Sequence, residues 1–166
     1  PSINTTGIVT ATSFVPTIGQ FSHRNIVING AMNVSQRGSS YTGTNSYGTV
    51  DRMACSHGGT DESPTQAQVD VASGTTPYTL GFRKAFKITN GDNGSANAGD
   101  NMEITFSFEG QDIATSGWDY VSTTSANSRL TLSFWIKVSV AQTFYGYFRT
   151  FEGTSMKWSF PITCRI

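Results

Sequence analysis

The chain has 166 residues, which fits one domain, and its 11 Lys and Arg balance its 11 Asp and Glu to a net charge of zero. This balance gives no basic footprint for nucleic acid or an acidic membrane, and no apolar run approaches the roughly 20 residues of a membrane-spanning helix. Charged residues are only 13%, about half the usual share. Thr, Ser, Asn and Gly replace them, and these residues favour strands and turns, so we expect an all-β protein.

The first 20 residues differ from the rest of the sequence. They carry no charge, and they place two apolar pairs, Ile8 with Val9 and Phe14 with Val15, between Thr, Ser and Gly. We predict that residues 1–20 form an N-terminal arm that attaches to neighbouring subunits. A disordered leader and a first strand of the main domain are the alternatives. Nothing at this end has the charged-then-apolar pattern of a signal peptide, so export by that signal is not expected.

Short strands are predicted at regular intervals after residue 21. The first, Ile26–Ile28, ends at Asn29 and Gly30, a strong turn dipeptide, and a polar loop occupies residues 38–48. The clearest alternation of apolar and polar residues lies in residues 102–108 and 130–138. The remaining extended or alternating segments are residues 50–53, 66–72, 80–89, 144–151 and 156–162.

No stretch has a convincing helical period with caps, so residues 21–166 are predicted to form an all-β, antiparallel β-sandwich or jelly roll. The last predicted strand ends four residues before Ile166. A sandwich of this kind needs one or two more strands to close its edges, so we expect further chain or a neighbouring subunit to supply them. Cys55 and Cys164 are far apart and lack metal-ligand spacing; buried free thiols are favoured over a disulfide.

Four segments, in this order, carry a family resemblance: NIVINGAMNVSQRG at 25–38, GTVDRM at 48–53, AFKITNGDNGSANAGDNMEITFSFEGQDI at 85–113 and LTLSFWIKVSVAQTFYGYFRT at 130–150. They resemble the carbohydrate-binding-like jelly-roll module of tailed-bacteriophage virion surface proteins. Met53 stands where that family usually has Trp. The resemblance spans about residues 24–160. The segment GIVTATSF near the N-terminus also resembles linkers in cyanophage and marine-phage structural proteins.

The resemblance implies a virion protein assembled in the host cytoplasm and displayed on the particle surface, as a tail or head fibre or a capsid decoration. Its partners would be the major capsid protein or tail and fibre subunits, and further copies of itself. Fibres of this kind are commonly trimers and decorations are monomers or trimers, so the oligomeric state stays open. No shaft-forming repeat is visible, which favours a capsid decoration or a short head fibre.

Sugar binding requires a flat aromatic side chain beside polar groups. Trp118, Asp119 and Tyr120 offer that combination in a loop, and Tyr145 and Tyr147 lie on one face of a predicted strand, where they could extend a platform. The alternative, slightly favoured for Trp118, is a side chain that anchors its loop in the core. For Trp135 and Trp158 a structural role is favoured.

The sequence predicts no cofactor, no metal and no catalysis. Asp92 and Asp100 are the first candidates for Ca²⁺ in the Gly- and Asn-rich segment 90–101, but the EF-hand spacing is missing and a surface turn explains it better. Glu103 and Glu109 are about 20 Å apart at strand rise, too far for a glycosidase pair. No nucleophile, zinc or phosphate-loop motif occurs.

The prediction is therefore a non-enzymatic structural protein on a phage virion, a capsid decoration or head fibre, with adhesion to host-surface glycans as an added role. The alternative is a tail-fibre module that recognises host glycans as a receptor, and behind it a polysaccharide depolymerase.

Overall fold

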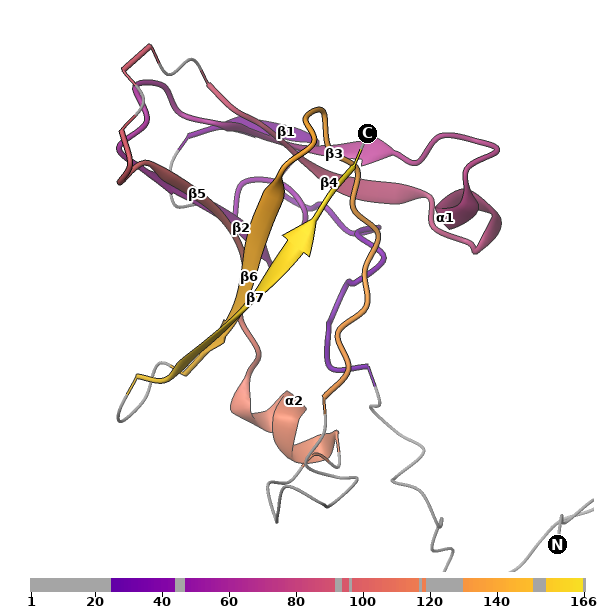
Figure 1. Cartoon of the computed structure of the whole chain (residues 1–166). Coiled ribbons are helices and arrows are strands. Elements are labelled where there is room, and N and C mark those ends of the chain that lie inside the picture. The colour runs from indigo at the N-terminus through magenta and orange to yellow at the C-terminus, as the bar shows by residue number, and fades with distance from the viewer. Residues whose placement is uncertain are drawn as a thin grey trace, which may run out of the picture. The chain divides into compact units, whose positions relative to one another are not determined.

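The computed structural model describes residues 25–43, 47–91, 94, 95, 97–116, 118, 130–150 and 155–165 (Figure 1). The chain divides into two compact units, unit 1 (Pro1–Leu130) and unit 2 (Thr131–Ile166). The predicted arm and its apolar residues Ile8, Val9, Phe14 and Val15 lie outside the described residues.

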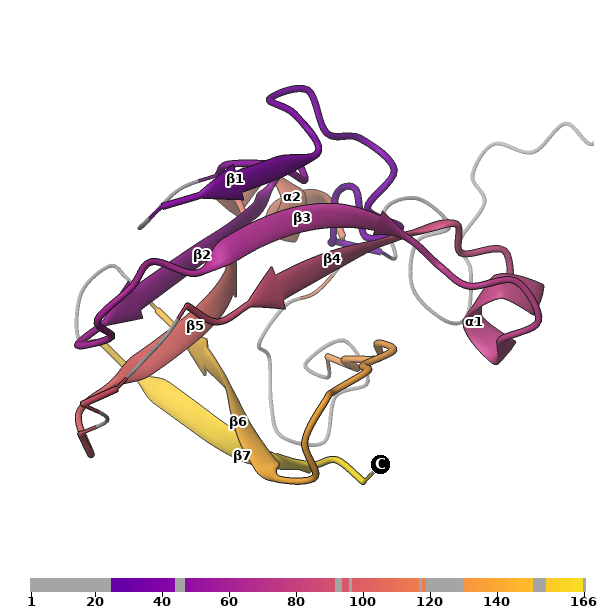
Figure 2. The same cartoon turned by 90° about the horizontal axis from the view of Figure 1, so that it is seen from above.

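Unit 1 contains two small antiparallel sheets (Figure 2). In the first, β3 (Thr65–Asp70) lies between β1 (Ser40–Thr42) and β4 (Lys84–Thr89). In the second, β2 (Met53–Gly58) pairs along its whole length with β5 (Asn101–Phe106). The register places Cys55 opposite Ile104 and Met53 opposite Phe106. Among the described strands neither sheet closes on itself, and each has open edges.

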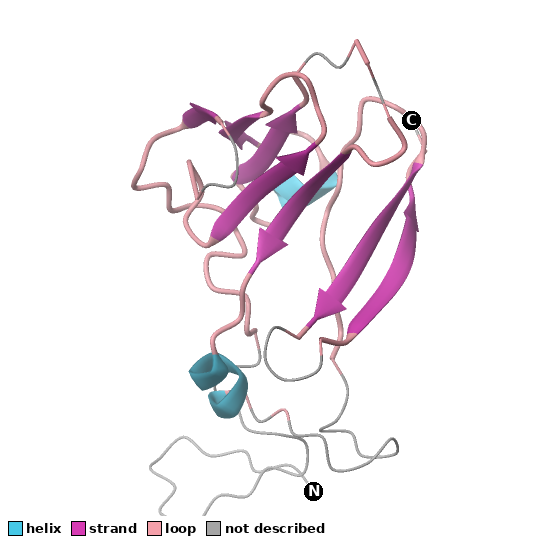
Figure 3. Ribbon diagram, turned by 90° about the vertical axis from the view of Figure 1, so that its left-hand side faces the viewer, coloured by secondary structure: helices cyan, strands magenta, loops and turns pink. Residues whose placement is uncertain are grey.

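The two helices of the described residues, α1 and α2, are short and belong to unit 1 (Figure 3). Helix α1 (Thr76–Thr79) has a proline, Pro77, in its first turn, where the fixed φ of proline suits the helix, and the chain leaves it through Gly81 at φ +101°. The Arg83 guanidinium lies 4.0 Å from the Tyr78 ring centroid and donates a 2.7 Å hydrogen bond to the Tyr78 carbonyl, which fixes the exit to β4. Helix α2 (Gly110–Thr115) follows β5. Neither described helix has the length and apolar run needed to cross a bilayer.

The core of unit 1 comes from one stretch of the chain. In β2, alternate residues Met53 and Cys55 are buried, and the preceding turn buries Thr49 and Val50 completely. Gln66 in β3 is also fully buried. Burial of a Val or Met side chain contributes about 1.5–3 kcal/mol, so these few residues contribute much of this unit's hydrophobic stabilisation.

Unit 2 is a two-stranded antiparallel sheet, in which β6 (Thr143–Arg149) pairs with β7 (Lys157–Thr163). Side chains alternate between its two faces, and directly opposite residues share a face. One face, called here the aromatic face, carries Phe144, Gly146, Phe148, Trp158, Phe160 and Ile162. The other, called the tyrosine face, carries Thr143, Tyr145, Tyr147, Arg149, Lys157, Ser159, Pro161 and Thr163.

The all-β prediction is confirmed in its coarse form, since the described residues form mainly strands in antiparallel sheets with few helices. The predicted strands at 66–72, 102–108, 144–151 and 156–162 correspond to β3, β5, β6 and β7. Both cysteines are free, buried thiols, and burial raises the pKa of Cys55.

Four predictions of extended backbone were wrong in whole or in part. Residues 50–52 lie in a bend and turn, where Arg52 takes φ +73°, and β2 begins only at Met53. Residues 26–28 lead directly into a turn, because Asn29 and Met32 both take left-handed φ values near +58°. The strand expected over residues 80–89 begins only at Lys84, because helix α1 ends at its start. Leu130–Val138 contains no strand, and residues 130–137 are exposed. A short strand, β1, also occurs inside the predicted polar loop.

Candidate functional site

The Asn-Gly turn of the first family-like segment is held by the side chain of Asn29. Its Oδ1 accepts a 3.0 Å hydrogen bond from the Val34 amide, and its Nδ2 donates to the Val34 carbonyl at 2.9 Å and to the Asp51 carbonyl at 3.0 Å. The Met32 amide also bonds to the Asn29 carbonyl at 2.8 Å. Asn tolerates the left-handed φ that this turn requires better than most residues do. Asn29 thus joins two segments that are 22 residues apart.

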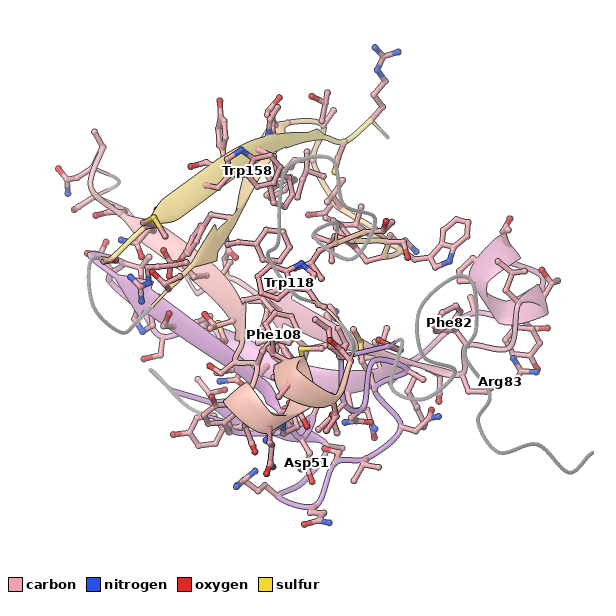
Figure 4. The ribbon with its side chains drawn as sticks, turned by 90° about the horizontal axis from the view of Figure 1, so that it is seen from below. Asp51, Phe82, Arg83, Phe108, Trp118 and Trp158 are labelled. Atoms are coloured by element: carbon pink, nitrogen blue, oxygen red, sulfur yellow. The ribbon has the colours of Figure 1, made fainter. Side chains whose placement is uncertain are left out.

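Asp51 completes this connection, called here the Asn29–Asp51 junction (Figure 4). Its carboxylate accepts a 3.1 Å hydrogen bond from the Gln36 amide and lies 3.8 Å from the Arg37 guanidinium. Nearby, the side-chain Nε2 of Gln68 donates to the Met32 carbonyl at 2.6 Å, which ties β3 to the same turn. The polar residues of the first two family-like segments therefore have an architectural use in this chain.

Arg52 forms the largest charged cluster among the described residues. Its guanidinium contacts the Glu109 and Asp112 carboxylates and lies 5.8 Å from the Phe106 ring centroid. The hydrogen bond from Arg52 lowers the pKa of Glu109, and the same bond raises the pKa of Arg52. Glu109 is therefore held as a charged carboxylate, the opposite of what a general acid needs.

His57 lines a small hollow in unit 1. The hollow has a volume of about 60 Å³, and its lining includes Thr60, Glu62, Asn90 and Met102. The His57 Nδ1 and Thr60 Oγ1 atoms are 2.5 Å apart. A ligand pocket is usually of the order of 300–1,000 Å³, so this hollow suits a few water molecules and is too small for a sugar ring.

The Gly- and Asn-rich segment before β5 is organised by carboxylates that accept backbone hydrogen bonds. Asp100 accepts from the Asn97 amide at 2.7 Å, and Asp61, from a different loop, accepts from the Ser95 amide at 3.1 Å. The other Ca²⁺ candidate, Asp92, lies outside the described residues. Within the described ranges no three His, Cys, Asp or Glu side chains are grouped to hold a metal.

Trp118 follows helix α2, where its backbone amide donates a 3.1 Å hydrogen bond to the Ser116 hydroxyl (Figure 4). The residue is half-buried, and its ring nitrogen is buried without a hydrogen-bond partner among the described residues. Burial of the polar edge of the indole favours the anchoring alternative over a sugar platform. Asp119 and Tyr120, the other members of this candidate site, lie outside the described residues.

The tyrosine face of β6–β7 presents the second candidate set. Tyr145 is 73% exposed and lies opposite Pro161, and Tyr147 lies opposite Ser159. The Lys157 ammonium is 3.9 Å from the Tyr147 ring centroid, and Arg149 is the register partner of Lys157. The structure therefore brings the two predicted tyrosines together on one face and adds two cations that we did not single out from the sequence. The alternation Lys157, Ser159, Pro161 was the signal that could have identified them.

The aromatic face is a continuous apolar cluster. The ring planes of Phe148 and Trp158 are 14° apart with centroids at 6.3 Å, and Phe160 lies 5.4 Å from Trp158. The Phe160 ring packs directly against Gly146, since a Cβ at this position would come within 2.5 Å of the ring, which would have to shift. Trp158 nevertheless remains 65% exposed. Trp158 thus packs against its aromatic neighbours while most of its own side chain stays accessible.

Residues 130–140 form a second exposed apolar segment. At least half of the Phe134 and Trp135 side chains is accessible, and Ile136 is 49% exposed. No backbone hydrogen bond joins residues 130–141 to any other described residue. The segment has the alternation of apolar and polar residues that is typical of a strand, but it pairs with no strand among the described residues.

Comparison of the chain with protein-family models, with curated proteins and with solved structures finds no match.

Proposed function

We propose that this chain is a non-enzymatic structural protein displayed on the surface of a tailed-phage virion, as a capsid decoration or head fibre. In this proposal it is a β-sandwich or jelly roll whose sheets are completed by neighbouring virion subunits, including further copies of itself. The resemblance of its four segments to virion surface proteins supplies the virion part of the proposal.

One observation carries the assembly part: large apolar side chains are exposed on or directly beside strands that have open edges among the described residues. Trp158 and Met156 are each about two-thirds exposed, at 65% and 67%, and Ile104 in β5 is 58% exposed. A two-stranded sheet such as β6–β7 is only marginally stable by itself in water. Exposed apolar side chains on small, open sheets are typical of a surface that another subunit covers.

The non-enzymatic part is supported by the structural use of five of the described carboxylates. Asp51 and Glu109 form ion pairs with arginines, and Asp70 forms a 2.6 Å ion pair with Lys84. Asp61 and Asp100 accept backbone hydrogen bonds. These roles stabilise loops and strands, and they keep the carboxylates away from acid–base chemistry.

The experiment combines location with assembly. An antibody raised against the chain should label purified particles of the phage that encodes it in electron micrographs. The isolated chain should elute above monomer mass in light-scattering chromatography, and the double variant L132S/F134S should shift it toward the monomer. The variant S133T, altered between these positions, is the matched control. A wild-type monomer at all concentrations, together with unlabelled particles, would refute the proposal.

A second function, a tail-fibre module that recognises host glycans, is favoured by a separate observation. Tyr145 is the most exposed of the large hydrophobic side chains among the described residues, at 73%, and it lies on a face with hydroxyl and cationic groups. An exposed flat ring beside polar groups is the usual arrangement for sugar stacking. A depolymerase is less favoured. Glycoside hydrolysis needs a pair of carboxylates, and neither β6 nor β7 places a carboxylate on the face that carries Tyr145.

A further inference from the structure

The two units carry opposite net charges although the whole chain is neutral. Residues 131–166 contain four Lys and Arg against one Glu, a net charge of +3, and residues 1–130 contain seven Lys and Arg against ten Asp and Glu, a net charge of −3. The single acid of unit 2, Glu152, lies outside the described residues. The strands β6 and β7 contain cations and no acid.

Two of these cations are on the tyrosine face. Arg149 and Lys157 are register partners at one end of the hairpin, next to the Tyr147 and Ser159 pair. The Lys157 ammonium lies over the Tyr147 ring at 3.9 Å, so the tyrosine positions the charge without neutralising it. Among the described residues Lys157 forms no ion pair, whereas Lys84 in unit 1 pairs with Asp70.

The rest of the face has the groups that a sugar ring requires. Tyr145 offers a flat ring that is 73% exposed, with Pro161 directly opposite it. The hydroxyls of Thr143 and Thr163, 3.4 Å apart, lie at the far end of the face. From Tyr145 to Arg149, the register partner of Lys157, the strand rises about 13 Å, so a polymer can stack on the tyrosine and reach the Lys157 ammonium with another of its units.

We propose that the tyrosine face binds an anionic polysaccharide whose acid groups are carboxylates, as in a polymer of uronic acids. Tyr145 stacks against the apolar face of a sugar ring, and the Lys157 ammonium binds the carboxylate of a neighbouring sugar. Charge complementarity selects this ligand, since Lys157 forms no ion pair among the described residues and β6 and β7 contain no acidic residue. This inference rests on the glycan-recognition function proposed second above and names its ligand class.

The test is a titration of the full chain with polygalacturonate at low salt, with neutral dextran and dextran sulfate as comparison polymers. We expect polygalacturonate to bind, with an affinity that falls as salt rises, and neutral dextran to bind far more weakly. K157Q should weaken binding roughly tenfold, as loss of one charge-assisted contact does, and reduce the salt dependence. Y145A should weaken binding by a similar factor, and Y145F, which retains the ring, should restore it.

K87Q is the matched control, because Lys87 is an exposed lysine on β4 in unit 1 and should leave binding unchanged. Equal binding of neutral dextran, preference for dextran sulfate alone, or binding unaffected by both K157Q and Y145A would each overturn the proposal. So would the absence of polygalacturonate binding by a wild-type chain with a cooperative thermal transition. The chromatographic mass is measured on the same samples, so a failure of glycan binding is distinguishable from a failure of assembly.

Discussion

The two compact units use their apolar side chains differently. In unit 1, Val50, Met53 and Cys55 are buried, and the polar groups around them are joined by side-chain hydrogen bonds that connect distant loops. In unit 2, Cys164 is the buried hydrophobic residue of the described part, while Trp158 and Tyr145 face outward. Residues of similar chemistry thus stabilise the fold in one unit and form an accessible surface in the other.

This difference in burial between the two units predicts which substitutions affect folding and which affect recognition. Burial links a side chain to stability, because its removal leaves a cavity, whereas an exposed side chain contributes little to folding and is available to a partner. Substitutions in unit 1 should therefore change stability first, and substitutions in unit 2 should change assembly or ligand binding first.

The largest effect is expected from a matched pair of methionines. Met53 is 7% exposed in β2, and Met156 is 67% exposed just before β7. M53A should lower the free energy of unfolding by about 2–4 kcal/mol, because it removes buried methylenes and leaves a cavity. M156A should change it by less than about 0.5 kcal/mol. Urea unfolding followed by far-ultraviolet circular dichroism measures both, and equal losses would remove the distinction between the units.

The Asn29–Asp51 junction should give the next largest effect. N29A removes three side-chain hydrogen bonds. It also replaces Asn with Ala, which tolerates a left-handed φ less well, so we expect the free energy of unfolding to fall by about 2 kcal/mol. N33A is the control, since Asn33 is exposed and its side chain makes no hydrogen bond to a described residue. The same unfolding measurement applies. A loss below about 0.5 kcal/mol for N29A would mean that the junction is not a major stabilising element.

The strands that could be predicted from sequence are those whose alternation or composition indicates a strand even when the pairing strand is unknown. β5, β6 and β7 are of this kind. The turn after Ile28 could not be predicted in full, because its geometry depends on a hydrogen bond from Asn29 to Asp51, 22 residues later. Short-range patterns indicate that a turn is present but do not identify a long-range acceptor.

The candidate site on the tyrosine face was also predictable only in part, because local patterns do not define long-range pairing. Alternation places Tyr145 and Tyr147 on one face, and the structure has them there. That Lys157 lies over Tyr147 and opposite Arg149 depends on the register of two strands, which a single sequence does not define. Leu130–Val138 shows the converse: its alternation predicts a strand, but a strand also requires a neighbouring backbone to pair with.

The smallest expected effect is the pH dependence that Glu109 gives to unit 1. Arg52 lowers the pKa of Glu109 below its ordinary value of 4.5, so the charged pair stabilises the folded state above that pH. This stabilisation is lost as the pH falls through the lowered pKa, where the carboxylate becomes protonated in the folded state too. The stability difference between wild type and E109Q should therefore be largest near neutral pH and should narrow in acid.

Urea midpoints of both proteins between about pH 6 and pH 3 measure this narrowing. Because the Glu109 side chain is nearly half exposed, the effect should be modest and should shrink further at high salt, which screens exposed charges. A salt-independent difference that stays constant across the range would assign the effect of E109Q to lost side-chain contacts. The charge of the pair would then contribute nothing measurable, and the fold of unit 1 would depend on its buried residues and the Asn29–Asp51 junction.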